Sequence, residues 1–379
     1  MKVSSFKAAT LLLLSLSLVL VSRDVFAASA GLLKAQKEAE AKGFIFETGH
    51  DEIVAKAKKG GAIQILSSSE PASYPHLIKS FKNRYPFLEV KMVETSGTDA
   101  AQRFLLELKT GRATEFDVVN LSHDYYPEYL PFAKKFDILG MAEQGVLNIP
   151  LKMVDPKNRT VVSLATALFV VAYNKNLISA EKVPNSWEDF LKPEFKGKKF
   201  MVEVRPLVYS IFASCPEQGL GEEWMVNYAK KMRAQEPVWI RGHSRGLAYL
   251  NSGEQLLHSG TYYHSAVRLK SKSPKDNVGI KFVEPVPATL LEPEIVLNSS
   301  RNPYSALLFL EHEASPEGQK ILDDNEPLKA SIHFPLSAAA KEVKGKKVCL
   351  NDYKTFPITH KWEKMAVEAF GFPREEKAK

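Results

Sequence analysis

AIQILSSSEPASYPHLIKSFKNRYPFLEVKMV, residues 62–93, contains the signals of a complete strand–helix–strand unit. The apolar segment 62–66 predicts a buried strand, and the Ser- and Pro-containing segment after it predicts a loop. Apolar residues then recur at helical spacing over 75–84, and partial alternation over 87–93 predicts a second strand. This unit is typical of an α/β sheet whose strands run mainly parallel.

The alternation of strands and helices continues along the chain. A helix is expected after Thr95, and strands are expected at 116–119, 164–173 and 198–202. Strands that alternate with single helices predict an α/β fold with mainly parallel sheets flanked by helices. The order of these signals fits two α/β units better than one barrel.

The composition of the chain is that of a globular protein. It has 379 residues, of which 45% are hydrophobic and 25% are charged, and this length allows two domains. The net charge is +7, and the Lys and Arg residues are spread along the chain without dense clusters. This distribution gives no support for nucleic-acid binding. The two cysteines cannot form a disulfide scaffold, and their spacing does not suggest a zinc site.

The first thirty residues have the three-part pattern of a secretory signal peptide. A basic start, an uncharged Leu-rich run at 8–22 and small residues at 28–30 predict a signal over 1–30 and a periplasmic protein. The apolar run is shorter than the roughly 20 residues of a membrane span, which disfavours a membrane anchor. We expect the mature chain to start near Gly31, with cleavage after Ala27 as the alternative. Removal of the signal lowers the net charge by two, from +7 to +5.

A serine motif leaves an enzymatic alternative open. Gly242–Gly246 reads GHSRG, with a strand expected at 238–240 and a helix at 247–250. This is the context of a nucleophile elbow, so Ser244 could serve a secreted serine hydrolase. The other interpretation is a helix N-terminus capped by Ser244, which can also bind anions. Residues that could complete a triad follow the motif: Asp276, Asp323, Asp324, His333 and His360.

The segment Ser186–Lys198, SWEDFLKPEFKGK, resembles a motif of the type II periplasmic substrate-binding proteins of ABC transporters. The resemblance covers most of residues 55–335, and its other segments are 57–61, 116–119, 172–174, 302–309 and 315–319. It implies two α/β lobes, each with a mainly parallel sheet flanked by helices, joined by a hinge. The lobes implied are 31–165 with 284–340 (lobe 1) and 166–283 with 341–379 (lobe 2), with hinges near 164–174 and 281–287.

Membership of this family would imply solute capture and no catalysis. The solute would close the two lobes, and a membrane permease would recognise the closed form. A sensory or scaffolding use of the same fold, in which the solute informs a membrane receptor, is the alternative within this class. A monomer without a resident cofactor is expected.

Among these proteins, the chain resembles the iron(III)-binding members most. Those members bind iron through two adjacent tyrosines of the second lobe, and Tyr262-Tyr263 stands at the matching place. A hard cation favours anionic oxygen donors such as phenolates. The alternative is that both tyrosines only line or support the cleft. The loop after the first strand departs from the iron-binding pattern, because it contains no histidine before His76.

The candidate ligand-binding residues lie mainly in loops at the ends of expected strands, where open α/β sheets bind their ligands. Their hydroxyl, imidazole and guanidinium groups suit a small organic or phosphorus-containing anion, or an anion beside a metal. They are Ser67, Ser68, Ser69, Thr95, Ser96, Thr98, Arg205, Arg241, His243, Ser244, Arg245, Tyr262 and Tyr263, and of these Tyr262 and Tyr263 are the candidate metal ligands.

Cys215 and Cys349 are expected to form a disulfide bond. An exported chain meets an oxidising compartment, where a pair of cysteines without metal-binding spacing is most simply explained by one bridge. Two separate thiols are the alternative. The family resemblance implies that the C-terminal tail returns to lobe 2, so the bridge would hold the tail without locking the hinge.

Overall fold

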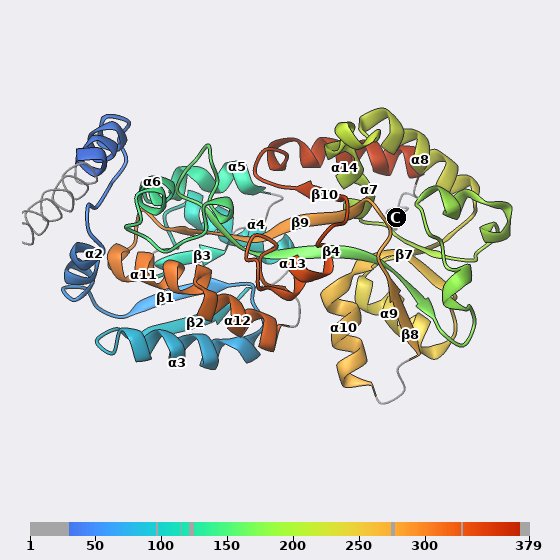
Figure 1. Ribbon diagram of the computed structural model, residues 1–379, viewed down its shortest axis with the longest axis horizontal. Helices are drawn as coiled ribbons and strands as arrows, with labels where there is room; N and C mark the ends of the chain where they lie inside the picture. The colour runs from blue at the N-terminus through green and yellow to red at the C-terminus, as the bar shows by residue number, and fades with distance from the viewer. Residues whose placement is uncertain are drawn as a thin grey trace, which may run out of the picture.

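The computed structural model describes residues 30–371 except 96–97, 114, 121–124, 274–276 and 327–328. It has two α/β lobes side by side, and two long strands run from one lobe into the other (Figure 1). The predicted fold class is therefore confirmed. The expected signal peptide and Ser96 lie outside the described residues. No helix in the described ranges has both the length and the apolar composition needed to cross a membrane.

Lobe 1 is built on the parallel strands β2, β1 and β3, in that spatial order. These strands are Ile63–Ser67 (β1), Val90–Glu94 (β2) and Val118–Asn120 (β3). A helix over 30–41 precedes the lobe. The other α-helices are His50–Ala57 (α2), Tyr74–Arg84 (α3), Thr98–Lys109 (α4), Tyr126–Tyr129 (α5), Ile138–Glu143 (α6), Pro303–Ala314 (α11) and Pro316–Asn325 (α12), with 3₁₀ turns at Pro71–Ser73, Leu130–Phe132 and Leu151–Met153.

Lobe 2 repeats this arrangement with the parallel strands β6, β5 and β7. Its strands are Met201–Glu203 (β5), Val238–Ile240 (β6), Leu257–Tyr262 (β7) and Val278–Lys281 (β8). Its helices are Leu207–Ser210 (α7), Glu222–Ala234 (α8), His243–Ser252 (α9), Tyr263–Lys272 (α10) and Phe356–Phe370 (α14). The 3₁₀ turns are Ala180–Lys182, Glu188–Leu191, Pro193–Phe195, Ile211–Ser214 and Pro216–Gln218.

The strands β4 (Val162–Asn174) and β9 (Val286–Val296) connect the lobes. They are antiparallel to each other, with β9 also pairing with β3 of lobe 1 and β4 pairing with β7 and β8 of lobe 2. Every residue of β4 is buried, so its apolar sequence fits a strand covered on both faces. The hinge expected near 164–174 coincides with β4. The second crossing strand is β9. It begins at the end of the range 281–287 expected for the second hinge and extends well beyond that range.

Each lobe has its own apolar core. The largest cluster of lobe 1 joins α2 and α3 to α11 and includes Leu77, Phe81 and Phe309. The largest cluster of lobe 2 contains Trp187 and Phe212 and extends to the last turns of α14. Within the SWEDFL segment, Ser186 Oγ accepts from the Asp189 backbone N–H at 3.2 Å, and the Asp189 carboxylate accepts from the Ser186 N–H at 3.0 Å. The predicted helix start is therefore present, although the helix is a short 3₁₀ turn.

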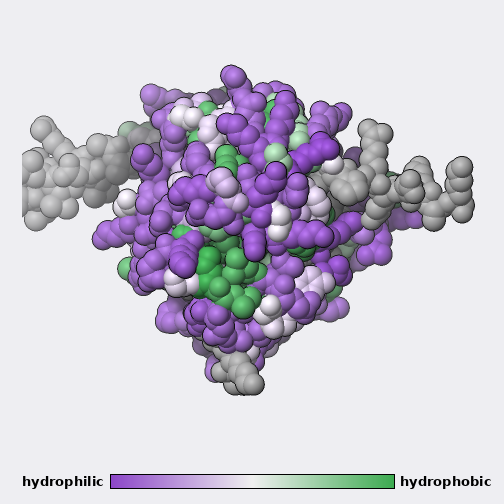
Figure 2. All heavy atoms as spheres, turned by 90° about the vertical axis from the view of Figure 1, so that its right-hand side faces the viewer, coloured by the Kyte–Doolittle hydropathy of each residue, from purple (hydrophilic) through white to green (hydrophobic). Residues whose placement is uncertain are grey.

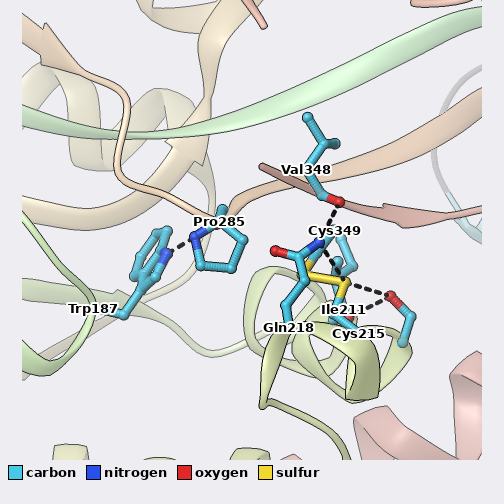
Figure 3. The surroundings of a disulfide bond; sticks show 8 residues. Trp187, Ile211, Cys215, Gln218, Pro285, Val348 and Cys349 are labelled. Atoms are coloured by element: carbon cyan, nitrogen blue, oxygen red, sulfur yellow. Dashed lines mark hydrogen bonds between the residues drawn. A yellow bond between two sulfur atoms is a disulfide. The ribbon is translucent and has the colours of Figure 1, made fainter. Parts of the chain in front are cut away.

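The predicted disulfide bond joins Cys215 to Cys349, with 5.7 Å between the two Cα atoms (Figure 3). Cys349 lies on β10 (Val348–Asn351), which pairs with β9, and α13 (Ala338–Glu342) precedes this strand. Both cysteines belong to the core cluster of lobe 2. Beside the bond, Gln218 Nε2 donates to the Val348 carbonyl at 3.0 Å. The bridge therefore fastens the C-terminal segment to lobe 2.

Candidate functional site

Most of the predicted site residues that the structure describes lie where the parallel strands of each lobe end. β1 and β2 deliver the serine loop 67–69 and Thr95 in lobe 1, and β5, β6 and β7 deliver Arg205, the GHSRG segment and Tyr262 in lobe 2. The carboxyl ends of parallel strands meet at one edge of a sheet, which is where open α/β folds place their ligands. The candidate site therefore has one half in each lobe.

The lobe 2 half is a group of aromatic rings around Tyr262. The Tyr262 ring lies 4.3 Å from that of His243, 4.7 Å from that of Phe169 and 5.0 Å from that of His264, measured between ring centroids. The Tyr262 and His264 rings are nearly parallel, at 18°. His258 continues the group behind His243, with 5.9 Å between their centroids. This packing fixes the Tyr262 ring at the end of β7.

The histidines of this group are held neutral. Burial, followed by the charge of Arg205, lowers the pKa of His243 to about 3, and burial lowers the pKa of His258 to about 3. The pKa of His264 is also well below its ordinary value, because of burial and then the charges of Lys329 and Arg268. Within the described chain, each of the three rings has one nitrogen without a hydrogen-bond partner: His243 Nδ1, His258 Nε2 and His264 Nδ1.

The GHSRG segment has a structural explanation in this lobe. The Gly242 N–H donates to the buried Glu203 carboxylate at 2.7 Å, and Gly242 has φ +104°, a conformation that favours glycine. Gly246 allows α9 to approach β7 closely, since a Cβ there would lie 2.6 Å from the His258 ring. Ser244 is exposed on the first turn of α9. The two glycines are thus required by the backbone and the packing, and no nucleophile is needed to explain them.

Three arginines come shortly after the ends of β5 and β6. The Arg205 side chain is 61% exposed and its Nε donates to Glu203 Oε1 at 3.2 Å. Arg241 and Arg245 are exposed and flank the start of α9. Together with the positive end of the helix dipole, these guanidinium groups make this side of lobe 2 electropositive.

The lobe 1 half is organised by a buried carboxylate that the sequence analysis did not identify. Glu292, on the crossing strand β9, accepts hydrogen bonds from Ser68 Oγ at 3.4 Å and Ser69 Oγ at 3.2 Å. Lys329 Nζ forms an ion pair with the same carboxylate. Ser67 Oγ accepts from the Ser69 N–H at 3.1 Å. The predicted serine loop is therefore already hydrogen-bonded to its own lobe.

Further buried carboxyl groups lie next to Glu292. Glu326 pairs with Lys329 at 2.7 Å, while burial raises the pKa of both Glu294 and Glu313, whose side chains are hydrogen-bonded to each other. Glu294 and Glu313 are each 1% exposed. Burial therefore favours the protonated form of both carboxyl groups, because two adjacent buried charges of the same sign repel each other.

The remaining lobe 1 candidates are less closely connected to this cluster. The Thr95 N–H donates to the Ser67 carbonyl at 2.8 Å, and Thr95 lines a cavity of about 490 Å³ that also contains Arg103 and Glu107. Thr98 begins α4, but its side chain, like Ser96, lies outside the described part of the structure. Of the three hydroxyl residues predicted after β2, the structure thus describes the side-chain surroundings of Thr95 alone.

Tyr263 packs away from Tyr262, although the two are adjacent in sequence. Its ring lies 4.9 Å from that of Phe282, and its hydroxyl donates to Glu342 Oε1 at 2.8 Å. Burial, reinforced by the Glu342 carboxylate, raises its pKa. The side chain belongs to a cluster with Val286 and other residues near the crossing strands. The two tyrosines therefore have different neighbours.

Metal ions in proteins are usually held by His, Cys, Asp and Glu side chains. The described residues contain no group of three such side chains that could hold an ion. Among the residues that could complete a triad with Ser244, Asp276 lies outside the described residues, and His360 lies on α14, where its nearest charged group is Glu363 at 3.9 Å.

A separate cavity of about 540 Å³ lies in the 178–199 segment of lobe 2 and is lined by Ile178, Phe195 and Leu256 among others. Figure 2 looks at the outer end of lobe 2 and shows a hydrophobic patch on that face, surrounded by hydrophilic residues. None of the predicted site residues lines this cavity. It is therefore distinct from the candidate site at the strand ends.

Comparisons with known proteins agree with the two-lobed arrangement. A family model described as bacterial extracellular solute-binding protein matches residues 125–365. A Trichodesmium protein (IdiA, FutA) in complex with iron and citrate is 20% identical, with a TM-score of 0.61 over 82% of this chain and 98% of its own. The apo ferric ion-binding protein A of Pasteurella haemolytica is 18% identical, with a TM-score of 0.62 over 84% of this chain and 100% of its own.

An ABC transporter substrate-binding protein from Bradyrhizobium japonicum is 16% identical, with a TM-score of 0.64 over 82% of this chain and 99% of its own. No curated protein matches the chain. At these sequence identities the structural similarities establish the fold of this chain. They do not establish its ligand.

Proposed function

Because the chain belongs to the family of bacterial extracellular solute-binding proteins, we propose that it captures a small anionic solute between its lobes for the permease of an ABC transporter. The observation that carries the anionic assignment is the electropositive side of lobe 2. There, the charge of Arg205 acts on His243, whose ring packs on that of Tyr262, and the exposed Arg241 and Arg245 flank the start of α9. Guanidinium groups and a helix N-terminus are the features that bind carboxylate and phosphate.

The neutral histidines support this proposal. An uncharged imidazole can donate a hydrogen bond through one ring nitrogen and accept through the other. His243 and His264 both pack against the Tyr262 ring, so they can hydrogen-bond a solute that the arginines hold by charge. The proposed lobe 2 contacts are Arg205, Arg241, His243, Ser244, Arg245 and Tyr262, and the proposed lobe 1 contacts are Ser67, Ser68, Ser69, Thr95, Ser96 and Thr98.

Lobe closure is the proposed mechanism of capture. β4 and β9 are the two long strands that run from one lobe into the other, so they are the natural hinge. A solute that contacts both lobes binds the closed form more tightly than the open form and therefore shifts the population towards it. We further propose that the permease recognises the closed form.

Ferric iron, alone or as a complex with the anion, is the second candidate solute. It is favoured by the Tyr262-Tyr263 pair at the end of β7 and by relatives solved as ferric-binding proteins. Binding through both phenolates requires Tyr263 to leave Glu342, since its hydroxyl now donates to that carboxylate. A free anion requires no such rearrangement, which is why we place it first.

We also propose that residues 1–30 direct the chain to the periplasm and are removed there. The intact mass of the exported protein tests this directly, with a mature chain beginning near Gly31 as the expected result. Exported protein that retains Met1 would contradict the proposal.

The solute assignment is tested by calorimetric titration of the ligand-free protein with phosphate, citrate and ferric citrate. We expect saturable binding of at least one anion without iron, and at least a tenfold loss of affinity in Arg205→Gln. Lys231→Gln, on the exposed side of α8, is the matched control and should bind like wild type. Binding that occurs only with iron, accompanied by a new visible absorbance band, would replace the anion with the ferric candidate.

A further inference from the structure

An ion pair joins the two lobes in addition to the crossing strands. Arg268 Nη1, on α10 of lobe 2, lies 2.5 Å from Glu70 Oε1, in the loop that follows β1 of lobe 1. The two side chains are 30% and 45% exposed, so the pair lies at the edge of the solvent. In Figure 1, α10 stands at the side of lobe 2 that faces lobe 1.

The lobe 1 end of this pair is firmly anchored. The Glu70 backbone N–H donates to Glu326 Oε1 at 2.5 Å, and Glu326 is completely buried. Lys329 forms ion pairs with both Glu326 and Glu292, and Glu292 is part of the crossing strand β9. The loop that carries Glu70 is thus connected through buried charged groups to the strand on which the lobes turn.

The lobe 2 end lies beside the proposed solute site. Arg268 follows His264 by four residues on α10, so the two side chains share one face of the helix. His264 in turn stacks on Tyr262, the central ring of the site. The positive charge of Arg268 also contributes to the lowered pKa of His264, which is consistent with their proximity.

We propose that Glu70 and Arg268 form an interlobe latch that closes the two lobes in the absence of solute and thereby sets the apparent solute affinity. The effect on solute affinity rests on the proposed function, whereas the effect on lobe closure does not. A partly exposed ion pair makes a modest contribution, so removing it lowers the ratio of closed to open protein about two- to fivefold. Apparent affinity falls by up to the same factor, because it scales with the population of the binding-competent form.

The latch is tested without any solute by measuring the distance between the lobes. Spin labels are placed on ketone-bearing residues at the exposed positions of Lys79 on α3 and Lys272 on α10, which leaves the disulfide bond untouched. Double electron–electron resonance then gives the interlobe distance distribution. We expect Glu70→Gln and Arg268→Gln each to shift it towards longer distances, and the double variant to shift it no further than either single variant.

Two controls keep the result specific. Glu89→Gln removes a similarly exposed ion pair with Lys82 inside lobe 1 and should leave the distribution unchanged. Roughly 1 M salt should lengthen the distance in wild type and have little effect in Glu70→Gln, because salt screens exposed charges. Unchanged distributions in both single variants would overturn the latch, whatever solute is bound. A shifted distribution would support the latch even if titration found no anion binding, so the two proposals fail separately.

Discussion

At the scale of single residues, Tyr262 and Tyr263 show how adjacent side chains acquire different environments. Tyr262 is the last residue of β7 and Tyr263 is the first of α10, so the backbone changes direction between them. The Tyr262 ring packs among His243, Phe169 and His264, whereas the Tyr263 hydroxyl donates to Glu342. The sequence could locate this pair at the end of a strand, but it could not separate the two side chains.

Because the two tyrosines have different neighbours, substituting one should affect solute binding and substituting the other should affect stability. Tyr262→Phe should weaken binding of the anion or ferric complex, since the Tyr262 ring is the centre of the lobe 2 half of the site. Tyr263→Phe should lower the free energy of unfolding by about 1 kcal/mol, since it loses one hydrogen bond, and should bind the free anion like wild type. Titration calorimetry and urea unfolding measure the two effects. Loss of free-anion binding in Tyr263→Phe would show that both hydroxyls act in the site.

The buried pair Glu294 and Glu313 predicts how stability depends on pH. The folded-state pKa of Glu294 is raised to about 8, above the roughly 4.3 of an unfolded Glu. Between these values the unfolded chain releases a proton that the folded chain keeps, so stability falls as the pH rises. The slope is at most about 1.4 kcal/mol per pH unit for each such proton.

Glu294→Gln should therefore flatten the loss of stability on going from about pH 5 to pH 8, since an amide does not titrate. Urea unfolding at several pH values measures this difference. Glu89→Gln, an exposed substitution in the same lobe, serves as the control and should keep the wild-type slope. If the free energy of unfolding of Glu294→Gln falls with pH as steeply as that of the wild type, other groups cause the loss of stability at high pH.

At the scale of elements, the sequence predicted apolar strands well and the second crossing strand poorly. The run at 164–173 lies within β4, which is Val162–Asn174. In contrast, β9 reads VPATLLEPEIV, and its two prolines and two glutamates are rare in central strands. Glu292 is accommodated by its ion pair with Lys329, and Glu294 by a raised pKa that favours its protonated form. Both are long-range effects that no local pattern reveals. Glu70 and Arg268 likewise lie 198 positions apart.

Removal of the disulfide bond between β10 and lobe 2 should lower the stability of the protein but leave the closure of the lobes unchanged. The bridge spans 134 positions, and removing a native disulfide costs about 2–5 kcal/mol. The variant Cys215→Ser/Cys349→Ser should therefore have a lower urea midpoint, but the same interlobe distances as wild type, because both cysteines belong to one core cluster. Two free thiols in the denatured, unreduced wild-type protein would contradict the bridge.

At the scale of the whole molecule, the lobes share more than their crossing strands. The C-terminal segment packs into both lobes, because Phe356 at the start of α14 lies in a lobe 1 cluster with Phe104 and Tyr126, while Phe370 at its end lies in the core of lobe 2. The Tyr353 hydroxyl also donates to the Met153 carbonyl of lobe 1 at 2.7 Å. A structure divided into two lobes is thus connected by β4, β9 and α14.

These shared elements predict that the lobes unfold together. Loss of either core removes the support for β4, β9 and α14, so calorimetry should show one transition. Phe356→Ala and Phe370→Ala, at opposite ends of α14, should each destabilise the protein by about 3–5 kcal/mol, as expected for deleting a buried Phe side chain. Both should lower the temperature of the same transition, although one belongs to the core of lobe 1 and the other to that of lobe 2. If Phe370→Ala instead splits the transition in two, with only one component shifted, the lobes are separate folding units and α14 does not couple them.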